Sequence, residues 1–419
     1  MVKEASLIVM ALLLGACNTA SPVSPTSIPS SPTSGAPTTE PATATPQPSG
    51  PQLSYKVAAF YYPWYGTPQF DGKWIHWTQN GHTPPADIGS DFYPVLGAYS
   101  SNDPDVVDQH MRWLREAGVG VIIVSWWGQG SQNERAVPLI LQTAARHDIK
   151  VTFHIEPYST RTADGLVSDV KYLYQRYGSS PAFFRSADTS TYSPNAQPKG
   201  MFFLWCVKYA GNCGQQPKVQ ADYWQAAMDA IHALPDGALV IANETDGSWV
   251  SGGHFDGLYN YATLHMDQDG GFSWARTIPA GSLYIPSVIP GFSAQRVGYP
   301  DDTRVPRNDG QTYSDQWTAA LGAGVQPAMV TITSFNEWHE GTMIEPAAAG
   351  KDDGLGSKYQ DYHTMPPDGY LALTRKWVDK FDPTPHADVT HDTEVPHSGL
   401  PAIGELGTDW QDQWRGRVN

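Results

Sequence analysis

The stretch AMVTITSFNEWHEGTMIEP, residues 328–346, joins a strand pattern to a dense group of reactive side chains. Met329–Phe335 alternates apolar or β-branched residues with Thr and Ser, as a buried β-strand does. A polar cluster follows and ends at Gly341, where the backbone turns easily; its members are Asn336, Glu337, Trp338, His339 and Glu340. Such a cluster directly after an apolar strand is typical of the active-site edge of a barrel or an open parallel sheet.

Glu337 and Glu340 are the candidate catalytic residues of this stretch. If residues 336–341 bend helically, the two side chains share one face, with Cβ atoms about 5–6 Å apart. Retaining glycosidases hold their two carboxyl groups about 5–5.5 Å apart, so the spacing indicates sugar chemistry. The alternative is structural, with one glutamate capping a turn and the other facing solvent.

Composition narrows the classes of function. The chain has 419 residues, among them 15 Trp and 21 Tyr, and a formal charge of −16. Proteins that bind nucleic acid present basic stripes to the phosphates, so this charge argues against a nucleic-acid partner. The aromatic content fits either a protein that stacks against sugar rings or an aromatic-rich core.

The first 17 residues have the pattern of an export signal. Lys3 supplies the charge, Leu7–Leu14 is apolar, and small residues precede Cys17. The apolar stretch is too short to span a bilayer. Residues 14–17 resemble a bacterial lipobox, which predicts a lipidated Cys17 and an enzyme anchored at the bacterial cell surface or the periplasmic face of the membrane. A plain secretory signal with a chance cysteine is the alternative.

Three further segments complete the predicted organisation. Residues 18–52 are rich in Ser, Thr and Pro and lack apolar periodicity, so we expect a disordered linker. Residues 53–383 form a single catalytic domain, and residues 384–419 form a Pro-rich C-terminal extension. Export favours a disulfide between Cys206 and Cys213, and the absence of a nearby His pair argues against a zinc site.

Apolar runs alternate with helical patterns through the catalytic domain. The predicted strands are 57–65, 119–127, 150–158, 200–205, 238–242, 255–261, 283–288 and 329–335. The predicted helices are 103–117, 134–147, 166–177, 221–233 and 370–381. Runs that are apolar on both faces and joined by helices indicate a covered parallel sheet, and eight of them predict a (β/α)8 TIM barrel. A doubly wound sheet is the alternative, but it would want a Gly-rich turn where residues 62–66 read YPWYG.

A barrel places reactive residues at the carboxyl ends of its strands. Here those ends carry aromatic residues interrupted by acids: Trp64, Tyr65, Trp126, Trp127, His154, Glu156, Tyr158, Trp205, Glu244, Tyr259, Tyr261 and residues 336–340. Aromatic faces beside carboxylates are typical of a sugar site.

Structural alternatives stay open for several of these residues. His154 also fits a core histidine, and Glu156 a salt-bridged structural acid. Glu244, Asp246 and Asp256 also fit loop or turn caps. Three arginines follow the seventh run, and we expect one to contact a sugar or a carboxylate and the others to be solvated; they are Arg296, Arg304 and Arg307.

The sequence contains neither a zinc-protease motif nor a serine-nucleophile motif. A zinc-protease HExxH beginning at His339 would need its second histidine at position 343, which is Met343. The nucleophile-elbow pattern GxSxG does not occur in the sequence. We therefore expect no metal and no other cofactor.

Seven strings along the chain carry a family resemblance. They are FYYPWYG (60–66), KWIHW (73–77), DQHMRWLREAGVGVIIVSWWG (108–128), HIEPY (154–158), DGLYNY (256–261), IPSVIPGF (285–292) and SFNEWHEGTMIEP (334–346). Together they resemble glycoside hydrolase family 99, the endo-α-1,2-mannosidases and endo-α-1,2-mannanases. The resemblance implies a (β/α)8 barrel and retaining, endo-acting cleavage of α-mannosides without a metal.

The resemblance also implies residue roles. Glu337 resembles the base that deprotonates the sugar 2-hydroxyl, whose attack on the anomeric carbon gives a 1,2-anhydro intermediate. Glu340 resembles the general acid/base that protonates the leaving oxygen and later activates water. The predicted substrate-binding residues are Tyr62, His76, Trp126, Trp127, His154, Glu156, Tyr261 and Asn336.

Two departures bear on which sugar is accepted: Met343 stands where many relatives have Gln, and residues 294–311 match more loosely. Trp126-Trp127 resembles the bacterial mannan-acting members. The hypothesis is an exported, monomeric bacterial lipoprotein that cleaves internal α-1,2-mannosidic bonds of α-mannan or a related oligosaccharide. The rivals are the same barrel acting on another α-glycan and a non-catalytic glycan-binding surface lipoprotein.

Overall fold

The computed structural model describes residues 52–185, 198–215, 218–261 and 271–383. The predicted export signal with Cys17, the linker up to residue 51 and the C-terminal extension lie outside the described residues. Of the helices in the described part, none combines the length and the apolar character that crossing a membrane requires.

The described residues form one nine-stranded parallel sheet. Its strands are β1 (Ser54–Tyr61), β2 (Val119–Trp126), β3 (Lys150–Ile155), β4 (Gly200–Leu204), β5 (Ala238–Asn243), β6 (Gly257–Tyr259), β7 (Leu283–Ile285), β8 (Ser287–Val288) and β9 (Val330–Ile332). The strand order is β7-β6-β5-β4-β3-β2-β1-β9-β8. Every pairing between neighbours is parallel, and all eight residues of β2 are buried.

The two outer strands of this order are one run of the chain. Only Pro286 separates β7, which pairs with β6, from β8, which pairs with β9. Proline has no N–H to give to the ladder, so it interrupts the run without ending it. The seventh predicted run therefore links both ends of the sheet, and the prediction of a (β/α)8 barrel in a single domain is confirmed.

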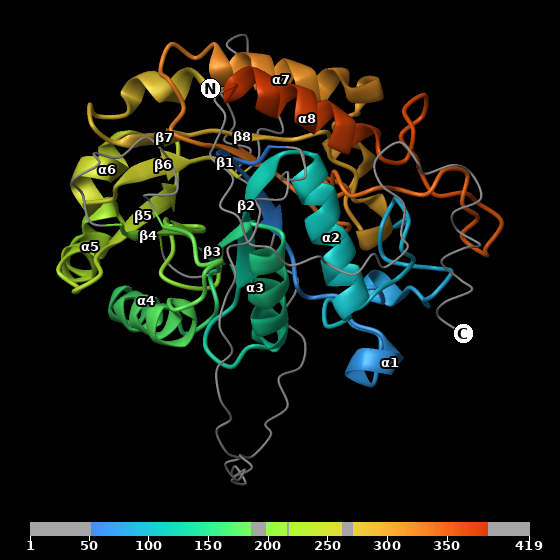
Figure 1. The fold of residues 1–419 in the computed structure, drawn as a ribbon, viewed down its shortest axis with the longest axis horizontal. Coiled ribbons are helices and arrows are strands. Elements are labelled where there is room, and N and C mark those ends of the chain that lie inside the picture. The colour runs from blue at the N-terminus through green and yellow to red at the C-terminus, as the bar shows by residue number, and fades with distance from the viewer. Residues whose placement is uncertain (1–51, 186–197, 216–217, 262–270, 384–419) are drawn as a thin grey trace, which may run out of the picture. The chain divides into compact units, whose positions relative to one another are not determined.

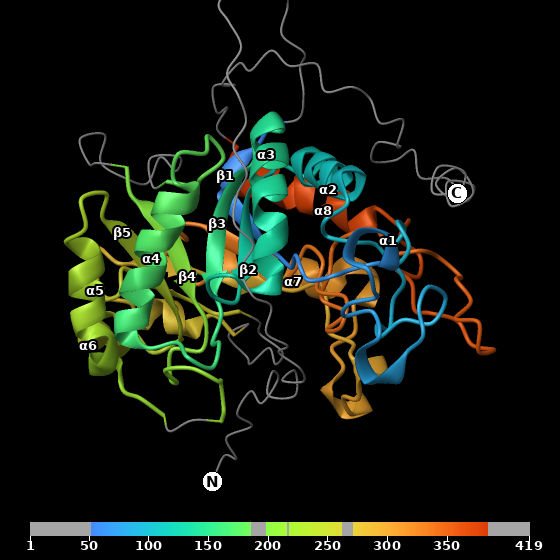
Figure 2. The same cartoon turned by 90° about the horizontal axis from the view of Figure 1, so that it is seen from below.

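Helices cover the outside of the sheet. They are α1 (Pro68–Asp71), α2 (Pro104–Glu116), α3 (Val137–Arg146), α4 (Ala163–Tyr177), α5 (Gln225–His232), α6 (Ser248–Gly253), α7 (Gln311–Leu321) and α8 (Gly369–Phe381). Figures 1 and 2 show α2 to α5 following one another around the strands, with α2 packed on α3 and α4 on α5. Asp103 starts α2 by accepting a hydrogen bond from the N–H of Asp105 at 3.0 Å.

The sequence patterns did not predict α6 and α7. In α7 the buried face includes Gln316 between aromatic residues, so its apolar periodicity is weak. Tertiary contact stabilises this helix instead: Trp317 stacks on Trp377 of α8, with ring centroids 5.8 Å apart. Figure 1 shows α7 and α8 side by side.

Aromatic rings pack together around Phe60 of β1. Its ring centroid lies 4.8 Å from that of His154, 5.1 Å from Tyr261 and 6.2 Å from Phe203. These residues belong to different strands or strand ends. The aromatic cluster therefore connects several strands of the barrel near their carboxyl ends.

Three long segments follow β1, β8 and β9, which are neighbours in the sheet: residues 62–103, 289–310 and 333–368. We call them the three-segment cap. Bridges join Phe92 to Gln360 and Pro94 to Ala347, and the N–H of Ser293 donates to the carbonyl of Glu340 at 2.8 Å. Parallel neighbours end at the same edge of a sheet, which is why these loops meet.

Candidate active site

The reactive cluster after β9 forms a closed turn, residues 334–345, which we call the catalytic turn. The N–H of Ser334 donates to the carbonyl of Thr342 at 2.9 Å, and the N–H of Ile344 donates to the carbonyl of Ser334 at 2.9 Å. No helix spans residues 336–341, and the N–H of Gly341 donates to the carbonyl of Trp338 at 3.2 Å, which makes a single turn over 338–341. Gly341 has φ 58°, and a Cβ there would lie 2.4 Å from the carbonyl oxygen of Ser293, so this position needs glycine.

The two glutamates of the turn differ in surroundings. Glu337 is buried, with 2% of its surface exposed, and its Oε1 accepts the N–H of His339 at 3.0 Å. Glu340 is partly exposed, and the hydroxyl of Tyr261 donates to its Oε2 at 3.4 Å. The hydroxyls of Tyr261 and Tyr62 are hydrogen-bonded to each other. The turn thus presents one enclosed and one accessible carboxyl beside two phenols.

Burial and mutual charge govern the protonation of the pair. Burial raises the pKa of Glu340 to about 7; the charge of Glu156 adds to this rise and the hydrogen bond from Tyr261 opposes it. Burial first, and then the charge of Glu340, raise the pKa of Glu337. Two carboxyls in such a place retain one proton near neutral pH. The backbone N–H groups of His339 and Glu340 favour the charged form of Glu337, but burial and the charge of Glu340 outweigh them.

Glu156 is a third carboxyl beside the pair. It is fully buried and accepts a hydrogen bond from Ser125 Oγ at 2.8 Å. Its Oε2 has no hydrogen-bond partner among the described residues. The charge of Glu156 helps to raise the pKa values of Tyr62, Glu337 and Glu340. The three acids therefore lie close enough for their charges to interact.

His154 lies within the aromatic core of the barrel. Only 1% of its surface is exposed, and its Nε2 lies 2.6 Å from the hydroxyl of Tyr259. Its Nδ1 lies 3.0 Å from Glu156 Oε1. The buried imidazole lies between Tyr259 and the carboxyl of Glu156, and direct substrate binding by His154 stays a prediction.

Trp64, His76 and His339 form a stack on the cap side of the turn. The rings of Trp64 and His76 are 4.6 Å apart and inclined by 18°. His339 Nε2 lies 3.0 Å from the carbonyl oxygen of His76, to which it donates. Burial lowers the pKa of His76 to about 3 and that of His339 to about 4, so both rings are neutral. His76 has φ 63°, an uncommon conformation that often marks a functional position.

Two other predicted substrate ligands, Trp126 and Asn336, are buried. Trp126 is fully buried and its indole N–H points to Glu134 Oε1 at 3.4 Å, because alternate side chains of β2 face opposite sides of the sheet. Trp127, in contrast, is partly exposed, and its indole donates to Ser125 Oγ at 3.1 Å. Asn336 is buried and binds the backbone N–H of Tyr62 at 2.7 Å and its carbonyl at 3.1 Å. Asn336 therefore holds the backbone of Tyr62, and its contact with substrate stays a prediction.

Glu345 was missed by the sequence reasoning. It is fully buried behind the catalytic turn and accepts from Tyr99 at 2.8 Å and from the indole of Trp338 at 2.9 Å. His110 Nε2 of α2 lies 3.2 Å from the same carboxyl. These partners are far apart in the sequence, so no local pattern indicates that they meet.

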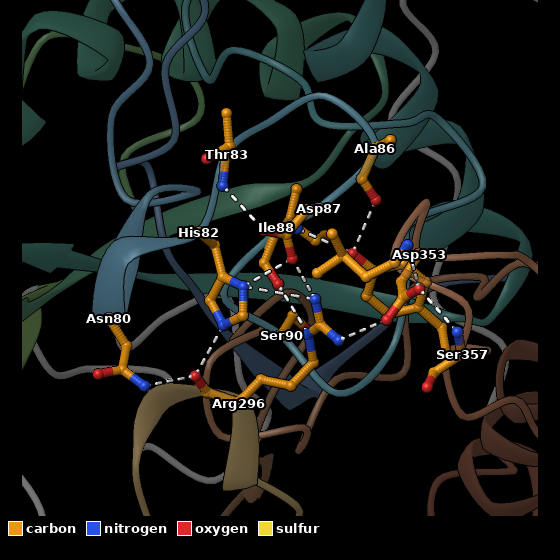
Figure 3. Close-up of polar contacts among 12 residues, drawn as sticks. Asn80, His82, Thr83, Ala86, Asp87, Ile88, Ser90, Arg296, Asp353 and Ser357 are labelled. Atoms are coloured by element: carbon orange, nitrogen blue, oxygen red, sulfur yellow. Dashed lines mark hydrogen bonds and ion pairs between the residues drawn. The ribbon is translucent and has the colours of Figure 1, made fainter.

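Arg296 fastens the cap, as Figure 3 shows. Its guanidinium pairs with Asp87, lies 3.3 Å from Asp353 Oδ2 and donates to the carbonyl of Ile88 at 3.0 Å. His82 lies at the same junction, with Nδ1 2.6 Å from Asp87. Arg296 thus joins all three cap segments through carboxylates, as was expected of one arginine in this loop.

The other candidate acids have structural partners. Asp256 accepts the N–H of Val240 at 2.8 Å, and Asp246 accepts the N–H of Ser248 at 2.9 Å. Glu244 pairs with Lys208 at 2.6 Å. Cys206 and Cys213 form a disulfide in the loop after β4. Within the described ranges, His, Cys, Asp and Glu residues form no group of three that is placed to hold a metal ion.

Comparison with known proteins gives consistent matches. A family model described as glycosyl hydrolase family 99 matches residues 52–383. The chain is 36% identical over 370 residues to the glycoprotein endo-alpha-1,2-mannosidase of Rattus norvegicus, covering 79% of this chain and 76% of that one. It is 34% identical over 373 residues to the glycoprotein endo-alpha-1,2-mannosidase-like protein of Homo sapiens, covering 77% and 75%.

A solved structure gives the same picture. The chain is similar to the GH99 endo-alpha-mannosidase from Bacteroides thetaiotaomicron, with a TM-score of 0.67 and 32% sequence identity. The match covers 79% of this chain and 98% of that chain. The barrel and the catalytic turn both lie inside the residues that the family model matches.

Proposed function

This chain belongs to glycosyl hydrolase family 99 and is a glycoside hydrolase, and from that premise we propose that it cleaves internal α-1,2-mannosidic bonds with retention of configuration. The names of its relatives supply the bond and the sugar, since those proteins are endo-α-1,2-mannosidases. The observation that carries the proposal is the pair Glu337 and Glu340, two carboxyls on one turn with pKa values raised by burial and by neighbouring carboxylates.

In the first step Glu337, as the carboxylate that accepts the N–H of His339, takes the proton of the mannose 2-hydroxyl. O2 then attacks C1 of the same sugar as the C1–O bond to the leaving sugar breaks. Glu340 donates its proton to that leaving oxygen, which departs as a hydroxyl. The product on the donor side is a 1,2-anhydro sugar. A pKa of about 7 suits a group that must hold its proton until this moment.

In the second step Glu340, now ionised, takes a proton from water. The water oxygen attacks C1, the C1–O2 bond opens, and O2 recovers its proton from Glu337. Both glutamates return to their starting states, and two displacements at C1 give net retention. Glu156 completes the chemistry on the donor side, because a further carboxyl with an unpartnered Oε2 suits a sugar hydroxyl.

Aromatic groups around the pair suit the rings of the substrate. Tyr62 and Tyr261 offer phenolic hydroxyls beside Glu340. Trp127 offers a partly exposed indole, and neutral His76 offers one donor and one acceptor. Flat apolar faces with a few polar groups are the usual lining of a carbohydrate site.

A panel of polysaccharides tests the proposal. Purified protein is incubated with α-1,2-linked mannan, other α-mannans, α-glucans and glycoprotein glycans, and new reducing ends are measured. We expect oligosaccharides from substrates with α-1,2-mannosidic bonds and none from α-glucans. Release from an α-glucan alone would replace the proposal by the rival barrel enzyme. The variants Glu337→Gln and Glu340→Gln should each lose about 10²–10⁴-fold in kcat while still binding mannan.

We also propose that the protein is exported and anchored through a lipid on Cys17. The support is the signal-like sequence of residues 1–17 and the Cys206–Cys213 disulfide, which fits an oxidising compartment. Expression in a bacterial host with a radiolabelled fatty acid should label the protein and place it in the membrane fraction. Cys17→Ser should abolish the label; an unlabelled wild-type protein would contradict the anchor.

A further inference from the structure

The loop after β8 contains three arginines in three different settings. Arg296 pairs with carboxylates of the cap. Arg304 is close to the surface and donates to Gln295 Oε1 at 3.0 Å. Arg307 is buried, with 7% of its surface exposed, although its position in a polar loop led us to expect a solvated or carboxylate-bound side chain. A buried guanidinium without a carboxylate needs a specific explanation.

Arg307 reaches the backbone of the catalytic turn. One terminal nitrogen donates to the carbonyl of Gly341 at 2.9 Å and to the carbonyl of Met343 at 2.7 Å. Gly341 directly follows Glu340 in the chain. The guanidinium of Arg307 is therefore hydrogen-bonded to the residues on both sides of Thr342, directly after Glu340.

Aromatic rings enclose the rest of this cation. The central carbon Cζ lies 4.9 Å from the ring centroid of Phe92, 4.7 Å from Tyr362 and 4.6 Å from Tyr370. Nε and the other terminal nitrogen have no hydrogen-bond partner among the described residues. Ring faces attract a desolvated cation. The three rings therefore fix the side chain of Arg307 and direct its hydrogen bonds to the carbonyls of the catalytic turn. The absence of a side chain at Gly291 leaves room for it, since a Cβ there would lie 2.7 Å from Arg307 Cγ.

The catalytic turn depends on such outside anchors because it is not a helix. Ser90 Oγ donates to the carbonyl of Trp338 at 2.7 Å, and the N–H of Ser293 donates to that of Glu340 at 2.8 Å. Arg307 holds the two carbonyls that follow. Each anchor comes from a cap segment. Arg307 bridges the carbonyls of Gly341 and Met343, and the hydroxyl of Tyr362 lies 3.4 Å from the carbonyl oxygen of Met343 and 2.6 Å from that of Glu345.

We propose that Arg307 is a positioning residue that aligns the carboxyl of Glu340 with the oxygen of the leaving sugar. The inference rests on the proposed role of Glu340 as the general acid. Arg307 acts through the backbone, so its loss impairs the step in which a proton must reach the leaving group. Binding of substrate and departure of a leaving group that needs no proton are not affected.

Two substrates with the same mannosyl donor part test this. One has a sugar as leaving group and the other has 2,4-dinitrophenolate, which leaves without protonation. The readout is kcat/KM, which reports the steps up to formation of the intermediate. For Arg307→Met we expect a loss of about 10²-fold on the sugar substrate and less than about fivefold on the aryl substrate, with KM for the sugar substrate unchanged. Arg307→Lys keeps a cation and a donor and should recover part of the loss.

Arg304→Met is the matched control, since it removes an exposed arginine of the same loop, and should change neither substrate. Equal losses on both substrates, or no loss on either, would overturn the inference. If Arg307→Met does not fold, Arg307→Lys decides the question by the same comparison. Glu340→Gln separates the two claims: if it distinguishes the substrates and the Arg307 variants do not, the inference alone fails. If Glu340→Gln does not distinguish them, the proposed role of Glu340 fails.

Discussion

Replacing Glu340 by glutamine should stabilise the fold at alkaline pH although it removes activity. The folded chain raises the pKa of this carboxyl from 4.5 to about 7, chiefly by burial. Between these two values the folded chain keeps the proton and the unfolded chain does not. The free energy of unfolding therefore falls as the pH rises from about 4.5 to about 7, and above that it stays at its lower level.

The magnitude follows from the two pKa values. Each unit of difference is worth about 1.4 kcal/mol, so ionising Glu340 in the fold costs about 3 kcal/mol at pH 8 and about 1 kcal/mol at pH 5. The side chain is partly exposed, and solvent screening roughly halves these figures. The glutamine variant should gain about 1–2 kcal/mol at pH 8, and less than about 1 kcal/mol at pH 5. For a domain of this size that is a rise in Tm of about 2 °C at pH 8.

Thermal unfolding of the wild type and Glu340→Gln at several pH values between 5 and 8 measures this difference. Asp315→Asn on α7 is the control, because that carboxylate is exposed and its replacement should change little at any pH. The reasoning is refuted if the advantage of Glu340→Gln shrinks as the pH rises, or if the variant is less stable than the wild type at pH 8.

Three further predictions concern activity and stability. In the wild type, kcat/KM should fall about tenfold per pH unit above about pH 7, as Glu340 loses its proton; a rate that stays constant to pH 9 would contradict the assigned acid. Replacing Cys206 and Cys213 together by serine opens a loop of sequence separation 7 and should lower the free energy of unfolding by about 2–3 kcal/mol, measured by urea titration; an unchanged midpoint would argue against the bond. Glu345→Ala leaves buried donors without an acceptor and should destabilise the fold by about 3–5 kcal/mol in the same assay; a change below 1 kcal/mol would show that the carboxyl is dispensable.

Much of the fold was predictable because it depends on local periodicity. Runs apolar on both faces and joined by helices describe a parallel barrel regardless of side-chain detail. Even the interruption at Pro286 left the seventh run recognisable. The helix α7 was missed because Trp317 is stabilised by Trp377, a residue of another helix, and no local pattern records such a contact.

The details of the site depend on long-range contacts, and there the sequence was less informative. Glu337 and Glu340 were recognisable as a pair, but the turn that carries them is held by Ser90, Ser293 and Arg307 of other segments. A helical bend was considered for residues 336–341 because those partners were unknown. The sequence also did not indicate which side of the sheet a residue at a strand end faces. Of the two adjacent tryptophans at the end of β2, strand pleating buries Trp126 and leaves Trp127 partly exposed.

The most direct test of the account is the anomeric form of the first product. An α-1,2-linked mannan oligosaccharide is cleaved in an NMR tube, and the anomeric protons of the new reducing end are followed before mutarotation. With retention, the reducing end of the released oligosaccharide appears first as the α-anomer, and Glu340→Gln gives no such signal. A β-anomer formed first, free mannose as the initial product, or equal cleavage by the variant would contradict the claim that Glu337 and Glu340 together break an internal α-mannosidic bond with retention.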